Sequence, residues 1–288
     1  MLSSSLSLVG PGRAGSAFAR SWLAAGGSLT EVIALDPAPA REAADMLGGG
    51  TPRAIAGPLA DCEILVLAVP DDAIAPAARL LAGRLRCRAA FHLSGALAAS
   101  ALEPLRPFGA SLGSLHPLRV FTGSPDESWN GAFVAMEGDA EALRVGVQVV
   151  SAVGARAHRI KAEAKPLYHA AATLAAGGTV AVISMATRAW GQAGIPEERA
   201  RPALAALAES AAAATVTREF SQAFTGPVAR RDRATLAAHR DALAGGADVL
   251  EVYCLLARET LRRTPGRGSE EEIGSLFKVQ SSKKDLPP

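Results

Sequence analysis

The sequence predicts an α/β fold, in which a doubly wound, mostly parallel sheet is followed by an all-α C-terminal domain. Three observations predict this class. Short apolar runs alternate with helical patterns over residues 1–161. Long Ala/Leu-rich helical patterns without strand signals follow them. A glycine-rich turn joins the first apolar run to the first helical pattern, as expected at a strand-to-helix junction.

The apolar runs predict the strands of the sheet. They lie at residues 6–9, 32–35, 64–69, 89–93, 111–115, 133–136 and 156–160. Helical patterns lie between several of them, at residues 14–25, 40–47, 72–81 and 140–153. This alternation favours parallel pairing with right-handed crossovers.

The second part of the chain is predicted to be entirely helical. Its helical patterns lie at residues 166–190, 197–220, 233–243 and 248–263, separated by Gly and Pro residues. We therefore predict an α/β, dinucleotide-binding domain over residues 1–161, a helical substrate and dimerisation domain over 162–265, and a polar, mobile tail over 266–288.

Composition excludes several classes of protein. The chain has 288 residues, 49% of them hydrophobic, and a net charge of +2, which argues against a nucleic-acid or anionic-membrane surface. Cys62, Cys87 and Cys254 are too far apart to predict a disulfide framework or a metal site. Residues 170–187 are uncharged but consist largely of Ala, Gly and Thr, so we expect a buried helix rather than a membrane span. With no leader sequence apparent, we expect a cytoplasmic protein.

A glycine-rich segment lies between the first strand and the first helix. The pattern G-x-G-x-x-G is met by Gly10, Pro11, Gly12, Arg13, Ala14 and Gly15. In Rossmann-type domains the first glycine permits a tight turn, the second lets the backbone approach a pyrophosphate, and the third packs the helix on the strand. The pattern alone also fits a bare structural turn, but its position between a strand and a helix favours dinucleotide binding.

An acidic residue follows the second predicted strand. Asp36 lies at the tip of that strand, where its carboxylate can accept hydrogen bonds from both ribose hydroxyls and repel a 2′-phosphate. We therefore expect NAD as the cofactor, with NADP as the alternative. Arg13 can add a charge-assisted contact to the pyrophosphate.

Two further regions are predicted at the carboxyl edge of the sheet. In LVLAVPDDAI, Ala68, Val69 and Pro70 end a strand, either as a plain strand-to-helix junction or beside the cofactor. In FHLSGAL and SLHPL, Ser94 and His116 follow strands and are predicted to face the ligand crevice, although a lone His before Pro is more often structural.

Several motifs occur in order along nearly the whole chain. They are LVGPGRAGSAFARSW, LAVPDDAI, HLSGAL, SLHPLRVF, KPLYHAAATLAAG, FTGPVARRD and LARETLRR. Together they resemble an uncharacterised family of two-domain bacterial proteins, with a Rossmann-like NAD(P)-binding domain and a helical domain of unknown function. The resemblance implies kinship with 6-phosphogluconate dehydrogenase, the β-hydroxyacid dehydrogenases, ketopantoate reductase, prephenate dehydrogenase and pyrroline-5-carboxylate reductase.

The resemblance also implies site residues on the long helix after the sheet. Several of these relatives carry a Lys followed four positions later by an Asn, and both face the substrate. Lys165 and His169 occupy the matching positions, one helical turn apart and hence on one face. A solvated Lys and a packed His are the structural alternative. Related chains often carry Ser-Asn in place of Gly177-Gly178, and Gly in place of Arg231.

These observations predict an NAD(P)-dependent oxidoreductase of unknown substrate. The expected reaction moves hydride between the nicotinamide and a small carbonyl, hydroxyl or imine compound bound between the two domains. Lys165, His169, Ser94 and His116 are the expected catalytic residues, and no metal is expected. A non-catalytic NAD(P)-binding regulatory or structural protein is the alternative. We also expect a homodimer formed through the helical domain.

Overall fold

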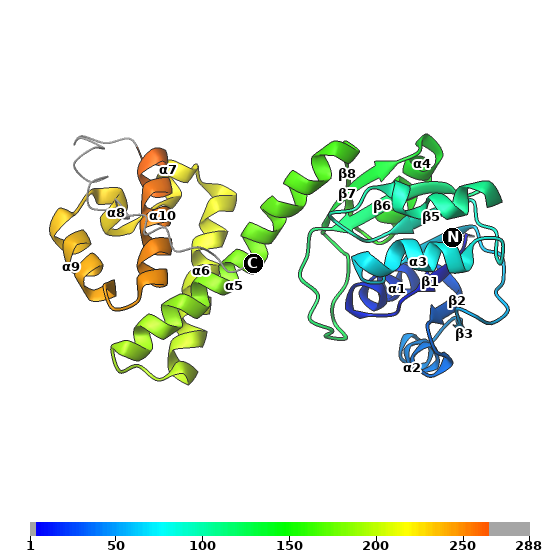
Figure 1. Ribbon diagram of the computed structural model, residues 1–288, viewed down its shortest axis with the longest axis horizontal. Helices are drawn as coiled ribbons and strands as arrows, with labels where there is room; N and C mark the ends of the chain where they lie inside the picture. The colour runs from blue at the N-terminus through cyan, green and yellow to red at the C-terminus, as the bar shows by residue number, and fades with distance from the viewer. Residues whose placement is uncertain (1–3, 265–288) are drawn as a thin grey trace, which may run out of the picture. The chain divides into compact units, whose positions relative to one another are not determined.

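The computed structural model describes residues 4–264, and the chain divides after Leu174 into two compact units (Figure 1). The first unit contains the whole sheet. The division falls inside a long helix, α5 (Lys165–Gln192). The expected 266–288 tail lies outside the described residues, and the assignment of the helical part as a substrate and dimerisation domain stays a prediction.

The first unit is built on an eight-stranded sheet in the order β3-β2-β1-β4-β5-β6-β7-β8. Neighbouring strands are parallel except β6 and β7, which are antiparallel. The predicted doubly wound, mostly parallel fold is therefore confirmed. The strands are β1 (Ser5–Val9), β2 (Ser28–Ala34), β3 (Thr51–Ala54), β4 (Ile64–Leu67), β5 (Ala89–His92), β6 (Ser111–Pro117), β7 (Phe133–Gly138) and β8 (Arg156–Arg159).

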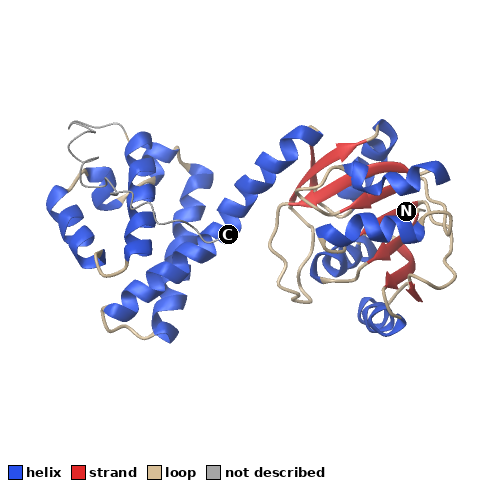
Figure 2. Ribbon diagram, viewed as in Figure 1, coloured by secondary structure: helices blue, strands red, loops and turns tan. Residues whose placement is uncertain are grey.

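Helices cover both faces of this sheet (Figure 2). One face packs against α1 (Arg13–Ala24), part of α2 (Pro37–Leu47) and α4 (Ala140–Ala152). The other packs against α3 (Asp71–Leu81) and the 3₁₀ segment η1 (Ala99–Phe108). Because β4 is covered on both sides, all four of its residues are buried, which explains its uninterrupted apolar sequence.

The strand register aligns one residue from each central strand across the sheet. Val9 pairs with Leu67, Leu67 with His92, and His92 with Ser114. Ser114 in turn lies opposite Glu137 of the antiparallel neighbour. The segments that follow this row in β1, β4, β5 and β6 therefore emerge together at the carboxyl edge, where ligands of open α/β sheets bind.

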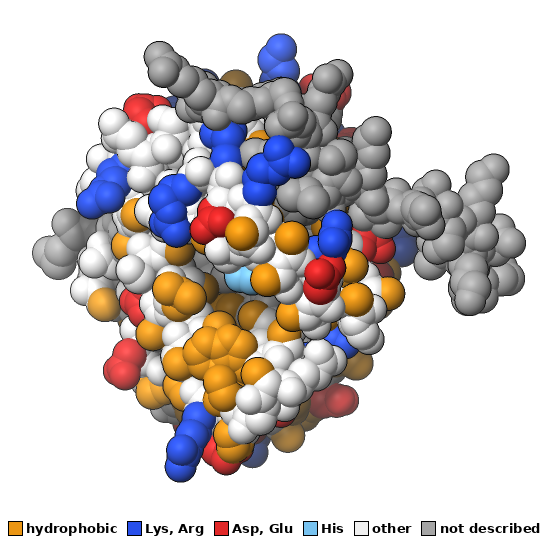
Figure 3. All heavy atoms as spheres, turned by 90° about the vertical axis from the view of Figure 1, so that its left-hand side faces the viewer, with side chains coloured by type: hydrophobic (Ala, Val, Ile, Leu, Met, Phe, Trp, Pro, Cys, Tyr) orange, Lys and Arg blue, Asp and Glu red, His pale blue; other side chains and the backbone are white. Residues whose placement is uncertain are grey.

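The helical unit has a small core. Its helices after α5 are α6 (Glu197–Thr217), α7 (Phe220–Ala223), α8 (Gly226–Arg230), α9 (Arg233–Leu243) and α10 (Ala247–Arg263). Among the described residues, one cluster of four buried apolar side chains forms there, made by Leu236, Cys254, Ala257 and Leu261. Figure 3 shows many hydrophobic side chains gathered on one face of this unit.

The long helix α5 is exposed where the sequence predicted burial. Only Lys165 is buried in it, and Leu174 is 75% exposed, so the prediction that residues 170–187 are buried is wrong for a single chain. The cause is that α5 is apolar on nearly all sides, and one chain does not cover it. Within the described chain, the segment Ala162–Gln192 is long and apolar enough to cross a membrane by length and composition. One such helix is weak evidence for a membrane protein.

Candidate functional site

The glycine-rich turn after β1 has the geometry of a phosphate-binding loop. Gly10 has φ 82°, and a Cβ there would lie 2.6 Å from Cγ1 of Val69, so the turn requires glycine. A Cβ on Gly15 would lie 2.6 Å from the Gly10 carbonyl oxygen, so this glycine permits close packing of α1 on the loop. A Cβ on Gly12 would meet nothing within 4 Å, so the backbone there faces open space. The three glycines thus have the tight turn, the open backbone and the close helix packing that the dinucleotide motif requires.

The N-terminus of α1 provides hydrogen-bond donors toward that space. Gly12 is the N-cap, and no side chain caps the helix. The first N–H groups of any helix have no acceptor within it, and here they belong to Arg13, Ala14 and Gly15. Together with the helix dipole they favour an anion, above all a phosphate.

A cavity of about 400 Å³ lies beside this turn. It brings together residues 10–12 and the end of β4 and adds residues of α2, whereas Arg13, Ala14, Gly15 and Asp36 are not among its lining residues. Its lining is Gly10, Pro11, Gly12, Pro39, Glu42, Ala43, Met46, Ala68, Val69 and Pro70. Asp36 is exposed at the N-cap of α2, and its carboxylate makes no capping bond, so it is free to bind a ligand.

A buried lysine network lies just after β5 and in the middle of β6. Lys165 is 1% exposed, and its Nζ donates to the Ser94 carbonyl oxygen at 3.0 Å and to the Ser114 Oγ at 2.8 Å. The Ser114 hydroxyl donates in turn to Glu137 Oε1 at 3.3 Å. The structural alternative of a solvated Lys165 is therefore wrong.

Burial lowers the pKa of Lys165 to about 8, and the carboxylates of Glu137 and Asp71 partly oppose this shift. A neutral amine keeps two N–H bonds, which suffice for the two acceptors. The third proton of the ammonium form can therefore leave and return without the loss of either hydrogen bond. Such a group suits reversible proton transfer near neutral pH.

Two imidazoles and a phenol lie beside this network. His116 Nδ1 is 2.8 Å from the Tyr168 hydroxyl, and the ring centroids of His116 and His169 are 5.5 Å apart. A Cβ on Gly95 would lie 2.4 Å from His169 Nδ1 and 2.8 Å from His116 Nε2. Both ring nitrogens therefore converge on Gly95, where no side chain fits. Burial, followed by the nearby His169 and Lys165, lowers the pKa of His116 to about 4.

The side chains of Ser94 and His92 hold the turn after β5. Ser94 Oγ accepts hydrogen bonds from the N–H groups of Ala96 and Leu97 at 3.1 and 3.0 Å. His92 Nδ1 accepts from the Ser94 N–H, so Nε2 carries the proton that it donates to the Ala98 carbonyl. Burial lowers the pKa of His92 to about 4. Ser94 thus supports the site through its carbonyl and its turn.

The sequence did not single out Ser114, Glu137 or Tyr168 as members of this cluster. Glu137 is the one charged residue in the buried strand FVAMEG, and a charge in an otherwise apolar strand was a usable signal. Tyr168 lies three positions after Lys165 on the same helical face, which was a second signal. Within the described chain, no group of three or more His, Cys, Asp or Glu residues could hold a metal.

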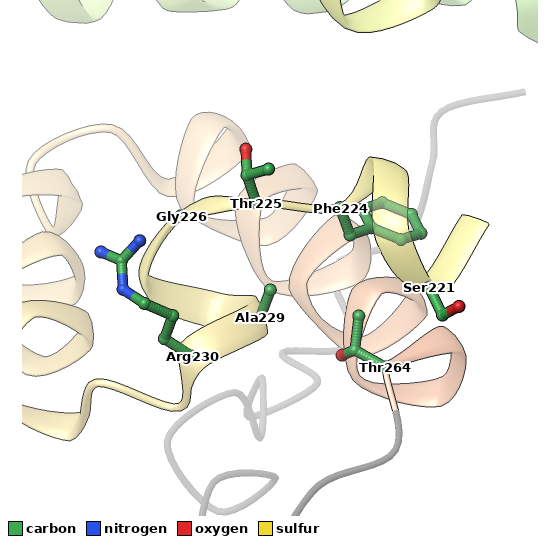
Figure 4. A pocket seen from close by; sticks show the side chains of 7 residues that line it. All are labelled: Ser221, Phe224, Thr225, Gly226, Ala229, Arg230 and Thr264. Atoms are coloured by element: carbon green, nitrogen blue, oxygen red, sulfur yellow. The ribbon is translucent and has the colours of Figure 1, made fainter. Parts of the chain in front are cut away.

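A second cavity lies in the helical unit (Figure 4). Its volume is about 480 Å³, and its lining is Ser221, Phe224, Thr225, Gly226, Ala229, Arg230 and Thr264. The side chains of Arg230 and Ser221 point in opposite directions, so its polar groups do not converge on one ligand position.

The fold and these sites together define a Rossmann-type domain followed by a helical part. Residues 132–260 match the family described as domain of unknown function DUF2520. A comparison with curated proteins finds no match. The predicted resemblance to proteins that combine a Rossmann-like domain with a helical domain of unknown function is confirmed.

Solved structures share this fold over almost the whole chain. A candidate NADP oxidoreductase from Bacteroides fragilis has a TM-score of 0.74 at 19% identity, covering 90% of this chain and 98% of its own. A protein from Thermotoga maritima has a TM-score of 0.71 at 21% identity, covering 94% and 98%. A pyrroline-5-carboxylate reductase from Coxiella burnetii has a TM-score of 0.60 at 14% identity, covering 91% and 99%. At these identities the likeness establishes the fold.

The buried His92 and the half-buried His116 give a pH-dependent prediction. We expect the His116 and His92 ring protons to titrate with midpoints near pH 4, well below the ordinary value of 6.5. Because unfolded chains protonate these rings at higher pH, the free energy of unfolding should fall as pH drops from about 6.5 to about 4. Proton NMR titration measures the midpoints, with single His116→Asn and His92→Asn variants for assignment. A midpoint near 6.5 for His116 would show that the ring is solvated.

Proposed function

We propose that this protein is an NAD(P)-dependent oxidoreductase that acts on a small carbonyl or imine compound, or on the corresponding alcohol or amine. The proposal rests on the observation that two sites lie along the same edge of the sheet. The glycine turn follows β1, and the Lys165 network contacts the turn after β5 and Ser114 in the middle of β6. Ligands of open α/β sheets bind along this edge. Structures of similar fold are described as NADP-dependent or as reductases, which supports the proposal.

The residues around the glycine turn fit a dinucleotide. Gly12 faces open space, the first N–H groups of α1 have no helical acceptor, and a cavity of about 400 Å³ adjoins them. Gly10, Gly12, Arg13 and Gly15 would hold the pyrophosphate, and Asp36 would accept the ribose hydroxyls, which favours NAD. When bound, the nicotinamide supplies or accepts a hydride at the substrate carbon.

The Lys165 network supplies the matching proton. As a carbonyl or imine carbon receives hydride, its oxygen or nitrogen gains negative charge and takes the third proton of the Lys165 ammonium. The neutral amine keeps its bonds to Ser94 and Ser114. In the reverse direction the same amine accepts the proton. His116, Tyr168 and His169 are half-buried and orient the polar atom of the substrate.

We also propose a homodimer formed through the helical unit. Its buried apolar cluster of four side chains is small for a unit of this length, while Val180 and Leu207 are 68% and 65% exposed. The uncharged face of α5 consists largely of small residues, which permit close helix packing. A second copy carries the same face, so a two-fold interface would cover both. The described cysteines are unpaired, consistent with the expected cytoplasmic location.

Substitution of Gly12 tests the nucleotide site. Gly12→Val should lower stability by no more than about 1 kcal/mol, because Val is a poorer N-cap than Gly, whereas Gly12 has φ −77° and nothing lies within 4 Å of its Cβ position. The side chain should nevertheless block the pyrophosphate and weaken NADH binding at least about tenfold. Isothermal titration measures both nucleotides, and NADH should bind the wild type more tightly than NADPH. Gly245→Val, also in open space, is the control. A wild type that binds neither nucleotide would refute the proposal.

Substitution of Lys165 separates an enzyme from a non-catalytic binding protein. Lys165→Met should lower kcat/KM by about 10²–10⁴-fold and leave the NADH dissociation constant within about threefold. The wild-type rate of carbonyl reduction should fall above pH 8, where Lys165 loses its proton. Turnover on a panel of small carbonyl and imine compounds provides the measurement. A loss below tenfold would show that Lys165 is not the proton donor, and a wild type that binds NADH without turnover of any compound would favour the regulatory alternative.

The oligomeric state tests the proposed dimer. Light scattering coupled to size exclusion should give a dimer at micromolar concentration. Val180→Arg should give a monomer, because a charge on this face cannot be buried against a second copy. Leu80→Arg on α3, at a position that is 47% exposed, is the matched control and should remain dimeric. A wild-type monomer would contradict the proposal.

A further inference from the structure

The loop between β6 and β7 runs along α1, the helix that begins at the glycine turn. Trp129 is fully buried and packs edge-on against Phe18, with ring centroids 5.0 Å apart. The backbone N–H of Trp129 donates to Ser21 Oγ at 2.8 Å. One end of the loop is therefore anchored in the core of the first unit, next to α1.

The middle of the loop is held by a carboxylate and a guanidinium. Glu127 accepts hydrogen bonds from the Thr122 N–H at 2.6 Å, the Thr122 hydroxyl at 2.8 Å and the Gly123 N–H at 3.0 Å. Arg20 of α1 donates through Nη2 to the carbonyl oxygens of Ser124 and Glu127 at 3.0 and 3.4 Å. The N–H groups, with Thr122 first, hold the pKa of Glu127 below its usual range, so the carboxylate is charged at neutral pH. Residues 122–127 thus form a closed loop fastened to α1.

This closed loop touches the first residue of α1. Gly123 has φ 100°, and a Cβ there would lie 3.3 Å from Cγ and 3.6 Å from Cδ of Arg13. Gly123 therefore lies directly against the aliphatic stem of Arg13. Within residues 4–264 Arg13 forms no ion pair, so the loop constrains its stem while its guanidinium is free for a ligand.

We propose that the 122–127 loop is a positioning element for the diphosphate of the dinucleotide. It holds the Arg13 stem at the N-terminus of α1, so that the guanidinium meets the phosphates there. Glu127 is the positioning residue, because its carboxylate fixes the two N–H groups that set the path of the chain at Gly123. The inference rests on the proposed nucleotide site and adds a residue more than 100 positions away in the chain.

The direction in which the affinity for a diphosphate changes when Glu127 is replaced tests this inference. A carboxylate close to a diphosphate repels it, so removal of the charge alone should tighten binding. If Glu127 acts by positioning Arg13, its replacement should instead weaken binding. The two effects have opposite directions, and the observed sign separates them.

The experiment is a double-mutant cycle on the full chain, measured by isothermal titration with ADP and with adenosine. Glu127→Gln should weaken ADP binding about three- to tenfold and leave adenosine binding unchanged. Thr122→Val, which removes one of the three hydrogen bonds, should act in the same direction with a smaller effect. In an Arg13→Met background, Glu127→Gln should cause no further loss. Glu141→Gln, which removes another exposed carboxylate paired with arginines on the same unit, is the control and should change neither affinity.

Four results would overturn the inference. Glu127→Gln with unchanged or tighter ADP binding would show that the loop does not position the arginine. Equal losses in the wild-type and Arg13→Met backgrounds, or equal losses for ADP and adenosine, would indicate a general structural role. If the wild type binds neither NADH nor ADP, both this inference and the proposed nucleotide site fail. If NADH binds and the cycle shows no coupling, only the inference fails.

Discussion

A lysine ammonium buried to 1% exposure is costly unless each of its protons has an acceptor, and this requirement organises the site. Lys165 meets it for two of its three protons, with the Ser94 carbonyl just after β5 and the Ser114 hydroxyl within β6. The same two bonds fasten the start of α5 to the sheet. Ser114 passes one further hydrogen bond to Glu137, so the nearest carboxylate acts through a hydroxyl rather than as a direct ion pair.

The sheet supplies the positions on which this network depends. His92 pairs with Ser114 and lies one strand away from Leu67, so the turn after β5 emerges beside the strand end that borders the glycine turn. His92 then fixes that turn through the Ser94 N–H and the Ala98 carbonyl. The absence of a side chain at Gly95 lets the His116 and His169 rings approach it. The geometry of the backbone therefore determines where the titratable groups of the site lie.

Much of this architecture is readable in the sequence because it follows from local rules. The glycine pattern, the apolar β4 run and the paired Phe18 and Trp22 of α1 all report burial or turn geometry directly, and all are found as predicted. β3 was not predicted, because the sequence TPRA is short, contains Pro and is only half-buried.

Long-range features were harder to predict. The antiparallel pairing of β6 with β7 depends on the path of the 118–132 loop, which no local pattern encodes. The Ser114–Glu137 contact follows from that pairing, so Glu137 gains its role only once the register is known. The expected burial of α5 failed for another reason. A helix that is apolar all round predicts that something covers it, but not whether the cover comes from the same chain.

The pKa values of Lys165, His116 and Tyr168 differ enough that each group has one predominant charge state at neutral pH. Burial lowers the pKa of Lys165 to about 8 and the pKa of His116 to about 4, and it raises the pKa of Tyr168. Between these limits the imidazole and the phenol are neutral hydrogen-bonding groups, and Lys165 carries the positive charge. A single cation among neutral hydrogen-bond donors stabilises a transition state in which negative charge develops on an oxygen or nitrogen atom. The positive charge of Lys165 also disfavours protonation of His116, so the lysine is the charged member of this group of three across the neutral range.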